Sequence, residues 1–250
     1  MKSEQAMWMV LALVVLTAGC HYRGPKKPQA VQAPYGERQV WAVVPLRNES
    51  GSQYADGIKT ADRLAQRLET VGGLDVLPVN RVLAAMQALE LASLDSPSDV
   101  SNLRTVLGVD AVLVGSITAY DPYDPPKLGL AVELYFDPRR SSAQTTDVRK
   151  LVRAPTDDLA QPAEPIRPGP PVSVVSGFYD ASDPDVHERL VAYAQQRGAL
   201  DKLHEKHGWR LYQIDMDLYT EFVIDSVSRQ LLLVEAQRLA SHRLTEQPAP

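Results

Sequence analysis

The sequence predicts an α/β fold, a small sandwich built on a mixed sheet, and three observations support that class. Residues 110–120 form an apolar, β-branched run bounded by turn signals, which is typical of a strand that is buried on both faces. Residues 40–46 form a second run of the same character. Between the two runs, apolar residues recur at helical spacing, so we expect a helix to lie between the two strands.

Residues 39–136 are expected to form the core domain, which begins with the strand at 40–46. The helix that follows should end at Gly72 and Gly73, because glycine commonly terminates helices. Residues 74–78 then form a short strand. The apolar stripe of the helix consists of Ile58, Ala61, Leu64, Ala65, Leu68 and Val71, with charged residues on the other side.

Two further helices and two strands complete this domain. Asn80 is expected to cap the first of these helices, and Ser98 to begin the second. The central strand at 110–120 comes next. Residues 128–135 alternate between apolar and small or polar side chains, which predicts a half-buried strand antiparallel to the central one.

Residues 172–244 are expected to complete the same domain with a strand and helices. A strand at 172–179 can join the sheet, and Pro184 is suited to the start of the next helix. In the long helix after it, Asp225 and Arg229 are expected to pair at i,i+4 on the exposed side. The apolar stripe of that helix consists of Met216, Leu218, Tyr219, Phe222, Val223, Val227, Leu231 and Val234.

Residues 137–171 are expected to be a proline-rich insertion, mostly irregular, and residues 245–250 a tail. The favoured interpretation of the insertion is a mobile surface loop. The alternative is a docking segment, because proline-rich chains present side chains at low entropic cost. The basic residues that could then meet an acidic partner are Arg139, Arg140, Arg149, Lys150 and Arg153.

A signal peptide is expected at residues 1–19. Its apolar core, residues 6–16, is too short to cross a bilayer and has the length of a signal-peptide core. The segment LTAGC at 16–20 resembles the bacterial lipobox, although Thr17 stands where the motif prefers leucine. The resemblance implies cleavage between Gly19 and Cys20 and lipidation of the Cys20 thiol. The alternative is a plain secreted protein in which the cysteine is incidental.

Residues 20–38 are polar and without periodicity, so we expect a short tether between the lipid and the domain. Acyl chains on Cys20 would hold the protein on a membrane surface, since each buried methylene contributes about 0.8 kcal/mol. His21 stands where inner-membrane lipoproteins of some bacteria carry aspartate, which favours the outer membrane, with the domain facing the periplasm.

The chain resembles two families, the curli-secretion-channel lipoproteins and the penicillin-binding-protein activator lipoproteins. The resemblance rests on the lipobox, on residues 44–51 (VPLRNESG) and on residues 107–118 (LGVDAVLVGSIT). It implies an envelope lipoprotein whose domain binds other proteins and has no active site. It does not imply the channel itself, because we identify no long strands that alternate between polar and apolar residues as a membrane hairpin would.

Composition and motifs narrow the classes of function. The net charge of -5 argues against a nucleic-acid binder. A single cysteine excludes an internal disulfide and a cysteine metal site. Asp180, Asp183 and Asp185 lie close together, but the pattern of a calcium loop is missing and turn and helix-cap roles explain them. We expect no enzyme, no cofactor and no metal.

The predicted function is therefore that of a lipid-anchored, non-catalytic adaptor or regulator of a cell-envelope protein, such as a cell-wall synthase. The alternative is a self-assembling component of an envelope secretion or transport complex. In both cases the membrane and an envelope protein are the expected partners, and the second adds self-association.

Overall fold

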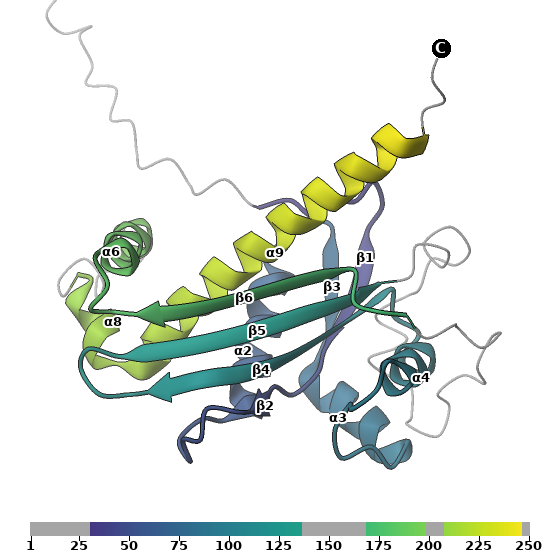
Figure 1. Cartoon of the computed structure of the whole chain (residues 1–250), viewed down its shortest axis with the longest axis horizontal. Coiled ribbons are helices and arrows are strands. Elements are labelled where there is room, and N and C mark those ends of the chain that lie inside the picture. Colours follow the sequence, from purple (N-terminus) through teal and green to yellow (C-terminus); the bar gives the residue numbers. More distant parts are fainter. Residues whose placement is uncertain (1–30, 137–168, 199–207, 247–250) are drawn as a thin grey trace, which may run out of the picture.

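The computed structural model describes residues 31–136, 169–198 and 208–246, and it confirms the expected α/β class (Figure 1). Within these residues, six strands form one mixed sheet in the order β3-β1-β4-β5-β6, with the short β2 paired to β4. Helices pack on both faces of the sheet, and each face has its own apolar core.

The parallel half of the sheet is built on the two apolar runs. β1 (Gln39–Val43) is buried along its whole length and lies between β3 (Leu74–Leu77) and β4 (Ala111–Asp121), both parallel to it. β2 (Arg47–Asn48) pairs with the middle of β4. Apart from β2, which falls in the segment expected to be a polar turn, the order strand, helix, strand, helix, helix, strand, strand is the predicted one.

The antiparallel half consists of β4, β5 (Lys127–Phe136) and β6 (Ser173–Asp180). The alternation along β5 is confirmed, because one set of its side chains is buried: Leu128, Leu130, Val132 and Leu134. β1 and β3 cross steeply behind the nearly horizontal β4, β5 and β6, as the right-handed twist of a sheet requires (Figure 1).

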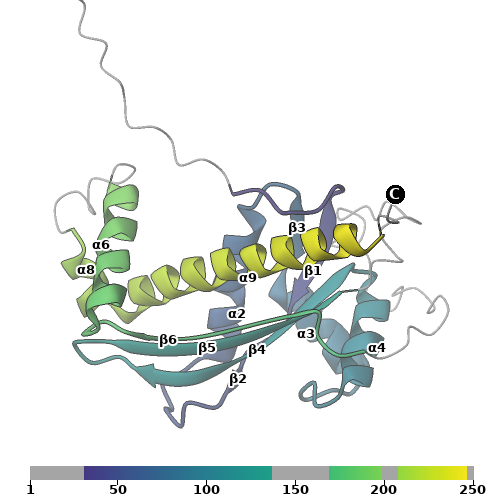
Figure 2. The same cartoon turned by 45° about the horizontal axis from the view of Figure 1, so that its top comes forward.

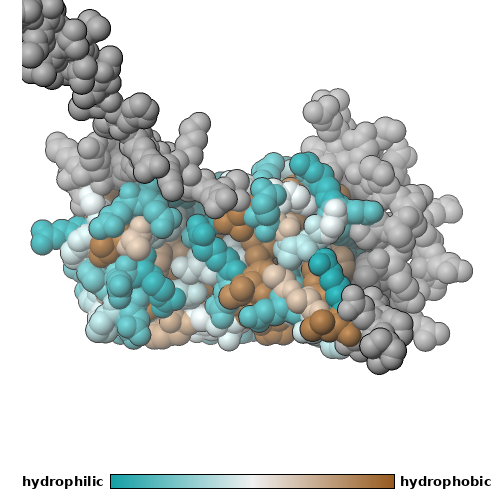
Figure 3. Space-filling view, turned by 90° about the horizontal axis from the view of Figure 1, so that it is seen from above, coloured by the Kyte–Doolittle hydropathy of each residue, from teal (hydrophilic) through white to brown (hydrophobic). Residues whose placement is uncertain are grey.

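One face of the sheet is covered by α2 (Gly57–Glu69) and by α9 (Met216–Glu246), which lies above β4, β5 and β6 in Figure 2. α6 (Pro184–Gly198) and α8 (Arg210–Ile214) stand at the end where α9 begins. Seen from above, the molecule is mainly hydrophilic on the left, with apolar groups gathered in the centre and on the right (Figure 3). The apolar stripe of α9 is buried at Tyr219, Phe222, Val223, Val227 and Leu231.

The opposite face carries α3 (Val79–Ala88) and α4 (Pro97–Leu107), which enclose a second core against β1 and the start of β4. Val82, Leu103 and Leu107 from the helices meet Ala42 and Val112 from the strands there, all of them almost fully buried. Both helices are short, so they cover only one end of the sheet on this side (Figure 2).

Two predicted helix starts are wrong by one or two residues. α3 begins at Val79 with Pro78 at its N-cap, so Asn80 lies inside the helix, and no side chain caps it. α4 begins at Pro97, because Ser96 rather than Ser98 caps it and forms a capping box with Asp99. Proline at the first helical position, residue 97, places the cap at Ser96, two residues before Ser98.

Two side chains lie on a different side from the one predicted. Ile58 is 51% exposed, because it belongs to the first turn of α2 and points away from the stripe that packs on the sheet. Asp225 and Arg229 do pair, with 2.6 Å between Oδ2 and Nε, but Asp225 is buried. Its other oxygen accepts a 2.6 Å hydrogen bond from Arg67 on α2, so the pair belongs to the contact between the two helices.

The segment before β1 lies against the domain from residue 31 onward. Gln32 forms an isolated parallel bridge with Gly72, and the amide of Ala33 donates to the carbonyl of Gly72 at 2.9 Å. Val31, Ala33 and Tyr35 pack against the core on the α9 face. The last part of the expected tether is therefore in contact with the domain. Among the described residues, no helix has the length and apolar character needed to cross a membrane.

Candidate functional site

One face of β4, β5 and β6 is only partly covered by the described helices. Ala111, Val112 and Leu113 are buried, but from Val114 onward the residues on the α3/α4 side are partly or fully exposed. Burial on both faces, predicted for the whole run, thus holds only for the first part of β4. The reason is that α3 and α4 end before they reach the far half of the strand.

A groove with a volume of about 510 Å³ lies where this coverage stops. Its floor is formed by β4 and β5, and its walls by the segment after β1, the first turn of α2, α3, and the loop and first turn of α4. Most of the wall side chains are apolar: Val44, Pro45, Leu46, Ile58, Leu83, Met86, Leu94, Pro97 and Val100. Buried neighbours keep this wall in place, so the groove is part of the fold.

The charged groups of the groove are mainly acidic. Arg47 lies beside Asp95, with 2.6 Å between its Nη2 and the Oδ1 of Asp95, and 3.9 Å from Glu49. The same guanidinium donates to the carbonyl of Leu94 at 3.3 Å. The fourth charged residue, Glu133, projects from the floor, and no ion pair joins it to any of the described residues. Carboxylates therefore outnumber guanidinium groups in the groove.

Tyr135 fixes the position of Glu133 on the floor. Its hydroxyl donates a 2.8 Å hydrogen bond to Oε2 of Glu133, two residues away on the same face of β5. Burial, that hydrogen bond and the negative charge of Glu133 raise the pKa of Tyr135 to about 12. Tyr135 therefore stays a neutral donor, and the second carboxylate oxygen of Glu133 accepts no hydrogen bond from the part of the chain that the structure describes.

The floor of the groove continues across the sheet to β6. Val114, Glu133 and Val174 form one row across the three strands, and Ser116, Ala131 and Ser176 form the next. Val174 and then Phe178 are 54% and 61% exposed on this face. We call the exposed β6 residues Val174, Ser176 and Phe178 the open face. Together with the groove, it is the candidate functional site.

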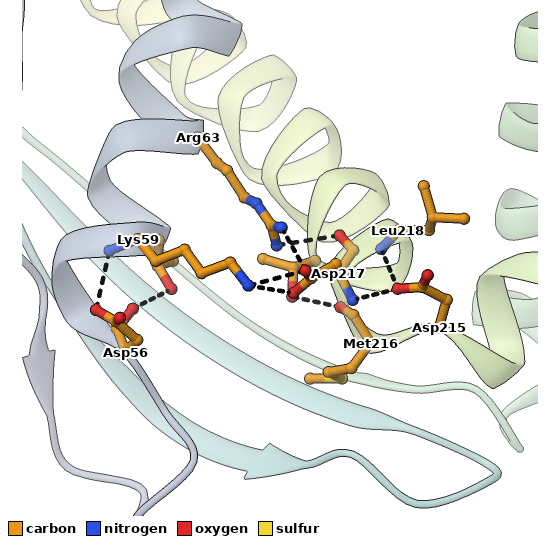
Figure 4. Close-up of polar contacts among 9 residues, drawn as sticks. Asp56, Lys59, Arg63, Asp215, Met216, Asp217 and Leu218 are labelled. Atoms are coloured by element: carbon orange, nitrogen blue, oxygen red, sulfur yellow. Dashed lines mark hydrogen bonds and ion pairs between the residues drawn. The ribbon is translucent and has the colours of Figure 1, made fainter.

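A second polar cluster joins α2 to the start of α9 (Figure 4). Asp217 accepts from Lys59 at 2.8 Å and pairs with Arg63 at 2.9 Å. The hydrogen bonds from Arg63 and Lys59 hold the pKa of Asp217 below its usual range. Asp56 and Asp215 cap the two helices, accepting from backbone amides two and three residues further on. All of these groups satisfy one another, so the cluster holds the helices together.

The acidic turn before α6 has the role expected of it. Asp183 accepts hydrogen bonds from the amides of Asp185 and Val186, and Asp180 accepts from Ser182. The hydroxyl of Ser182, with help from Lys127, holds the pKa of Asp180 below its usual range. Across the described residues, three or more metal-binding side chains nowhere gather into one group.

The site residues predicted from the sequence lie outside the described residues. Gly19 and Cys20 precede residue 31, and the basic residues of the insertion, from Arg139 to Arg153, fall between 136 and 169. Sequence reasoning missed the groove. The only signals were Ser116 and Glu133, which are polar residues within otherwise apolar strands.

The comparisons with known proteins give a distant likeness of fold. No protein-family model and no curated protein matches the chain. The C-terminal domain of LpoB from Salmonella enterica is 15% identical with a TM-score of 0.37, over 61% of this chain and 87% of that one. The lipoprotein GNA1162 from Neisseria meningitidis is 17% identical with a TM-score of 0.36, over 64% of this chain and 96% of that one.

A third structure, the PelC dodecamer from Paraburkholderia phytofirmans, is 16% identical with a TM-score of 0.26. It covers 47% of this chain and 71% of that one. At this level of similarity, the function of the present chain has to be argued from its own residues.

Proposed function

We propose that this protein is a lipid-anchored, non-catalytic adaptor of the bacterial cell envelope, and that it holds a protein partner in the groove and on the open face. The observation that carries the proposal is the partial coverage of the sheet. β4, β5 and β6 have a complete apolar core against α9, but on the other face they expose Val174 and Phe178 beside a groove walled by apolar side chains. Exposed apolar surface next to a preformed groove is typical of a protein-binding site.

The geometry of the chain is consistent with an anchor close to the domain. If Cys20 carries the lipid, the ten residues 21–30 can span no more than about 35 Å before the chain meets the domain at Val31. Residues 31–35 are fixed to the α9 face through Gly72 and the core. The lipid would therefore restrict the domain to the vicinity of the membrane, where its partner would be an envelope protein.

The anchor and the site can be tested in the same cells. The intact protein and its Cys20→Ala variant would be labelled with a fatty-acid analogue, and only the intact protein should take up the label. A photo-crosslinking amino acid at Ile58, exposed in the groove, should trap a defined envelope protein. The same amino acid at Leu233, which is 59% exposed on α9, serves as the control. Label on both proteins, or identical adducts from both positions, would contradict the proposal.

A second candidate function is a self-assembling component of an envelope complex. The observation in its favour is that β6 is at the edge of the described sheet and exposes Val174 and Phe178 next to that edge. The mass of the intact lipoprotein in mild detergent distinguishes the two. A closed ring that Phe178→Ser disrupts would support self-assembly, whereas a monomer that still yields the Ile58 adduct would support the adaptor.

A further inference from the structure

We infer that the groove binds a short segment of the partner in which a basic side chain stands between apolar ones. This inference rests on the proposed adaptor function and specifies the chemistry of its partner. It is carried by the charges in the groove, by the position of Glu133 and by the size and lining of the space.

The charges of the groove favour a cation. Arg47 is already engaged by Asp95 at 2.6 Å and by the carbonyl of Leu94 at 3.3 Å. Glu49 lies 3.9 Å from the same guanidinium, which leaves most of its charge uncompensated. Glu133 has no described ion-pair partner. A partner with a basic residue would balance this excess of negative charge, and an acidic one would increase it.

Glu133 is placed to receive that cation. It lies in the middle of β5, in one row with Val114 and Val174, and is partly buried among them. Tyr135 holds one of its oxygens at 2.8 Å and leaves the other directed away from that bond. A charge-assisted hydrogen bond from a guanidinium or ammonium group is stronger than a neutral one, and partial exclusion of water strengthens it further.

The lining and the volume of the groove indicate what surrounds the cation in the bound segment. Leu83, Met86 and Val100 line one wall, and Ile58 is exposed on the other, so apolar side chains can pack on either side of the cation. A helix of about 10–12 Å diameter fills about 400–600 Å³ in each turn. The volume of about 510 Å³ therefore limits the occupant to a short segment of a few residues.

The test uses the full-length lipoprotein in mild detergent and two fluorescent peptides. One peptide alternates leucine and arginine, and the other carries glutamine in place of arginine. We expect the arginine peptide to bind more tightly, with an affinity that falls as salt is added. Glu133→Gln should weaken its binding about tenfold and leave the glutamine peptide unaffected. As a control, Glu69→Gln removes the same charge from the exposed end of α2, outside the groove. It should leave the binding of both peptides unchanged.

The outcomes separate this inference from the proposed function. Equal binding of the two peptides, or equal effects of the Glu133 and Glu69 variants, would overturn the inference. If the Glu133 variant unfolds at the same temperature as the wild type, its weaker binding reflects a change in the site and not in the fold. Crosslinks from Ile58 to the chain's own Arg139–Arg153 would assign the groove to an internal occupant and also overturn it. If the partner peptide in the Ile58 adduct contained no basic residue, the adaptor proposal would stand but this inference would be overturned.

Discussion

The phenolic hydroxyl of Tyr35 donates a 2.6 Å hydrogen bond to Oε2 of Glu235, 200 positions further along the chain. Glu235 is fully buried in α9. Ser173, the first residue of β6, donates to its Oε1, and Arg238 forms two further bonds at 2.8 and 2.9 Å. This network joins the segment that leads to the expected anchor, the edge of the sheet and the long helix.

The acid dependence of stability should reflect this network. Burial by itself raises the pKa of Glu235, but the hydrogen bonds from Arg238, Ser173 and Tyr35 outweigh it and hold the pKa below its usual range. A carboxyl with a lowered pKa stabilises the fold above its unfolded pKa of about 4.3, and this contribution is lost as the pH falls through the folded value. We therefore expect the free energy of unfolding to fall below about pH 4.3.

Glu235→Gln provides the measurement. It should lower the free energy of unfolding at pH 7 by about 3 kcal/mol, because Arg238 loses its buried partner. The unfolding free energies from urea titrations at pH 7 and at pH 3.5 should then differ less for this variant than for the wild type. Glu221→Gln, at a position 42% exposed on the same helix, is the control and should retain the wild-type acid dependence. An unchanged pH difference in the Glu235 variant would refute the role of this carboxyl.

The N-cap of α4 gives a second prediction. The Ser96 hydroxyl accepts from the amide of Asp99 at 3.2 Å, whose carboxylate accepts in return from the amide of Ser96 at 3.0 Å. Ser96→Ala should therefore cost about 1 kcal/mol of unfolding free energy. Ser98→Ala, at an exposed position two residues further on, should stay within about 0.5 kcal/mol of the wild type. If the two variants had equal effects in chemical denaturation, the capping box would not contribute.

The start of α2 leads to a third prediction. A Cβ added at Gly57 would lie 1.8 Å from the carbonyl oxygen of Leu46, and the carbonyl of Gly57 accepts from the amide of Leu46 at 3.1 Å. Gly57→Ala should thus move the groove wall and cost about 1–3 kcal/mol. Gly36→Ala is the matched control, since nothing lies within 4 Å of its added Cβ. Thermal unfolding of both variants checks this, and a stable Gly57 variant would contradict the close approach.

Features of the fold that depend on residues close together in the sequence could be predicted, and those that depend on residues far apart could not. The alternation along β5 and the apolar stripe of α9 depend on nearest neighbours in the sequence, and both are confirmed. The cap at Ser96 was missed by two residues because Ser96 and Ser98 are equally good N-cap residues. The bond between Tyr35 and Glu235 depends on how α9 lies across the sheet, which no local pattern specifies.

The same reasoning applies to the candidate site. An apolar strand predicts burial on both faces, but the actual burial of β4 depends on where α3 and α4 end above it. Ser116 and Glu133, two polar residues in otherwise apolar strands, were the visible signals. That Glu133 lies in a row with Val114 and Val174 follows from strand register, and the register with β6 is set across the insertion.

The contact between α2 and α9 yields a fourth prediction. Asp217 pairs with Lys59 and Arg63, and its own side chain is 49% exposed (Figure 4). Asp217→Asn should lower the unfolding free energy by about 0.2–1 kcal/mol, and the difference should shrink at 1 M salt. Asp62→Asn, at an exposed position on α2, should be neutral. A larger effect that resists salt would show that the pairs are more strongly shielded than their exposure indicates.

The open face gives the last prediction, in which stability and partner binding separate. Val174 and Phe178 are 54% and 61% exposed, so replacing both by serine should change the unfolding free energy by no more than about 0.5 kcal/mol. The same change removes apolar surface next to the groove, and it should reduce the yield of the Ile58 adduct at least several-fold. Leu233→Ser, at an equally exposed position on α9, should leave the yield unchanged. Undiminished crosslinking in the double variant would confine the partner to the groove and exclude the open face from the interface.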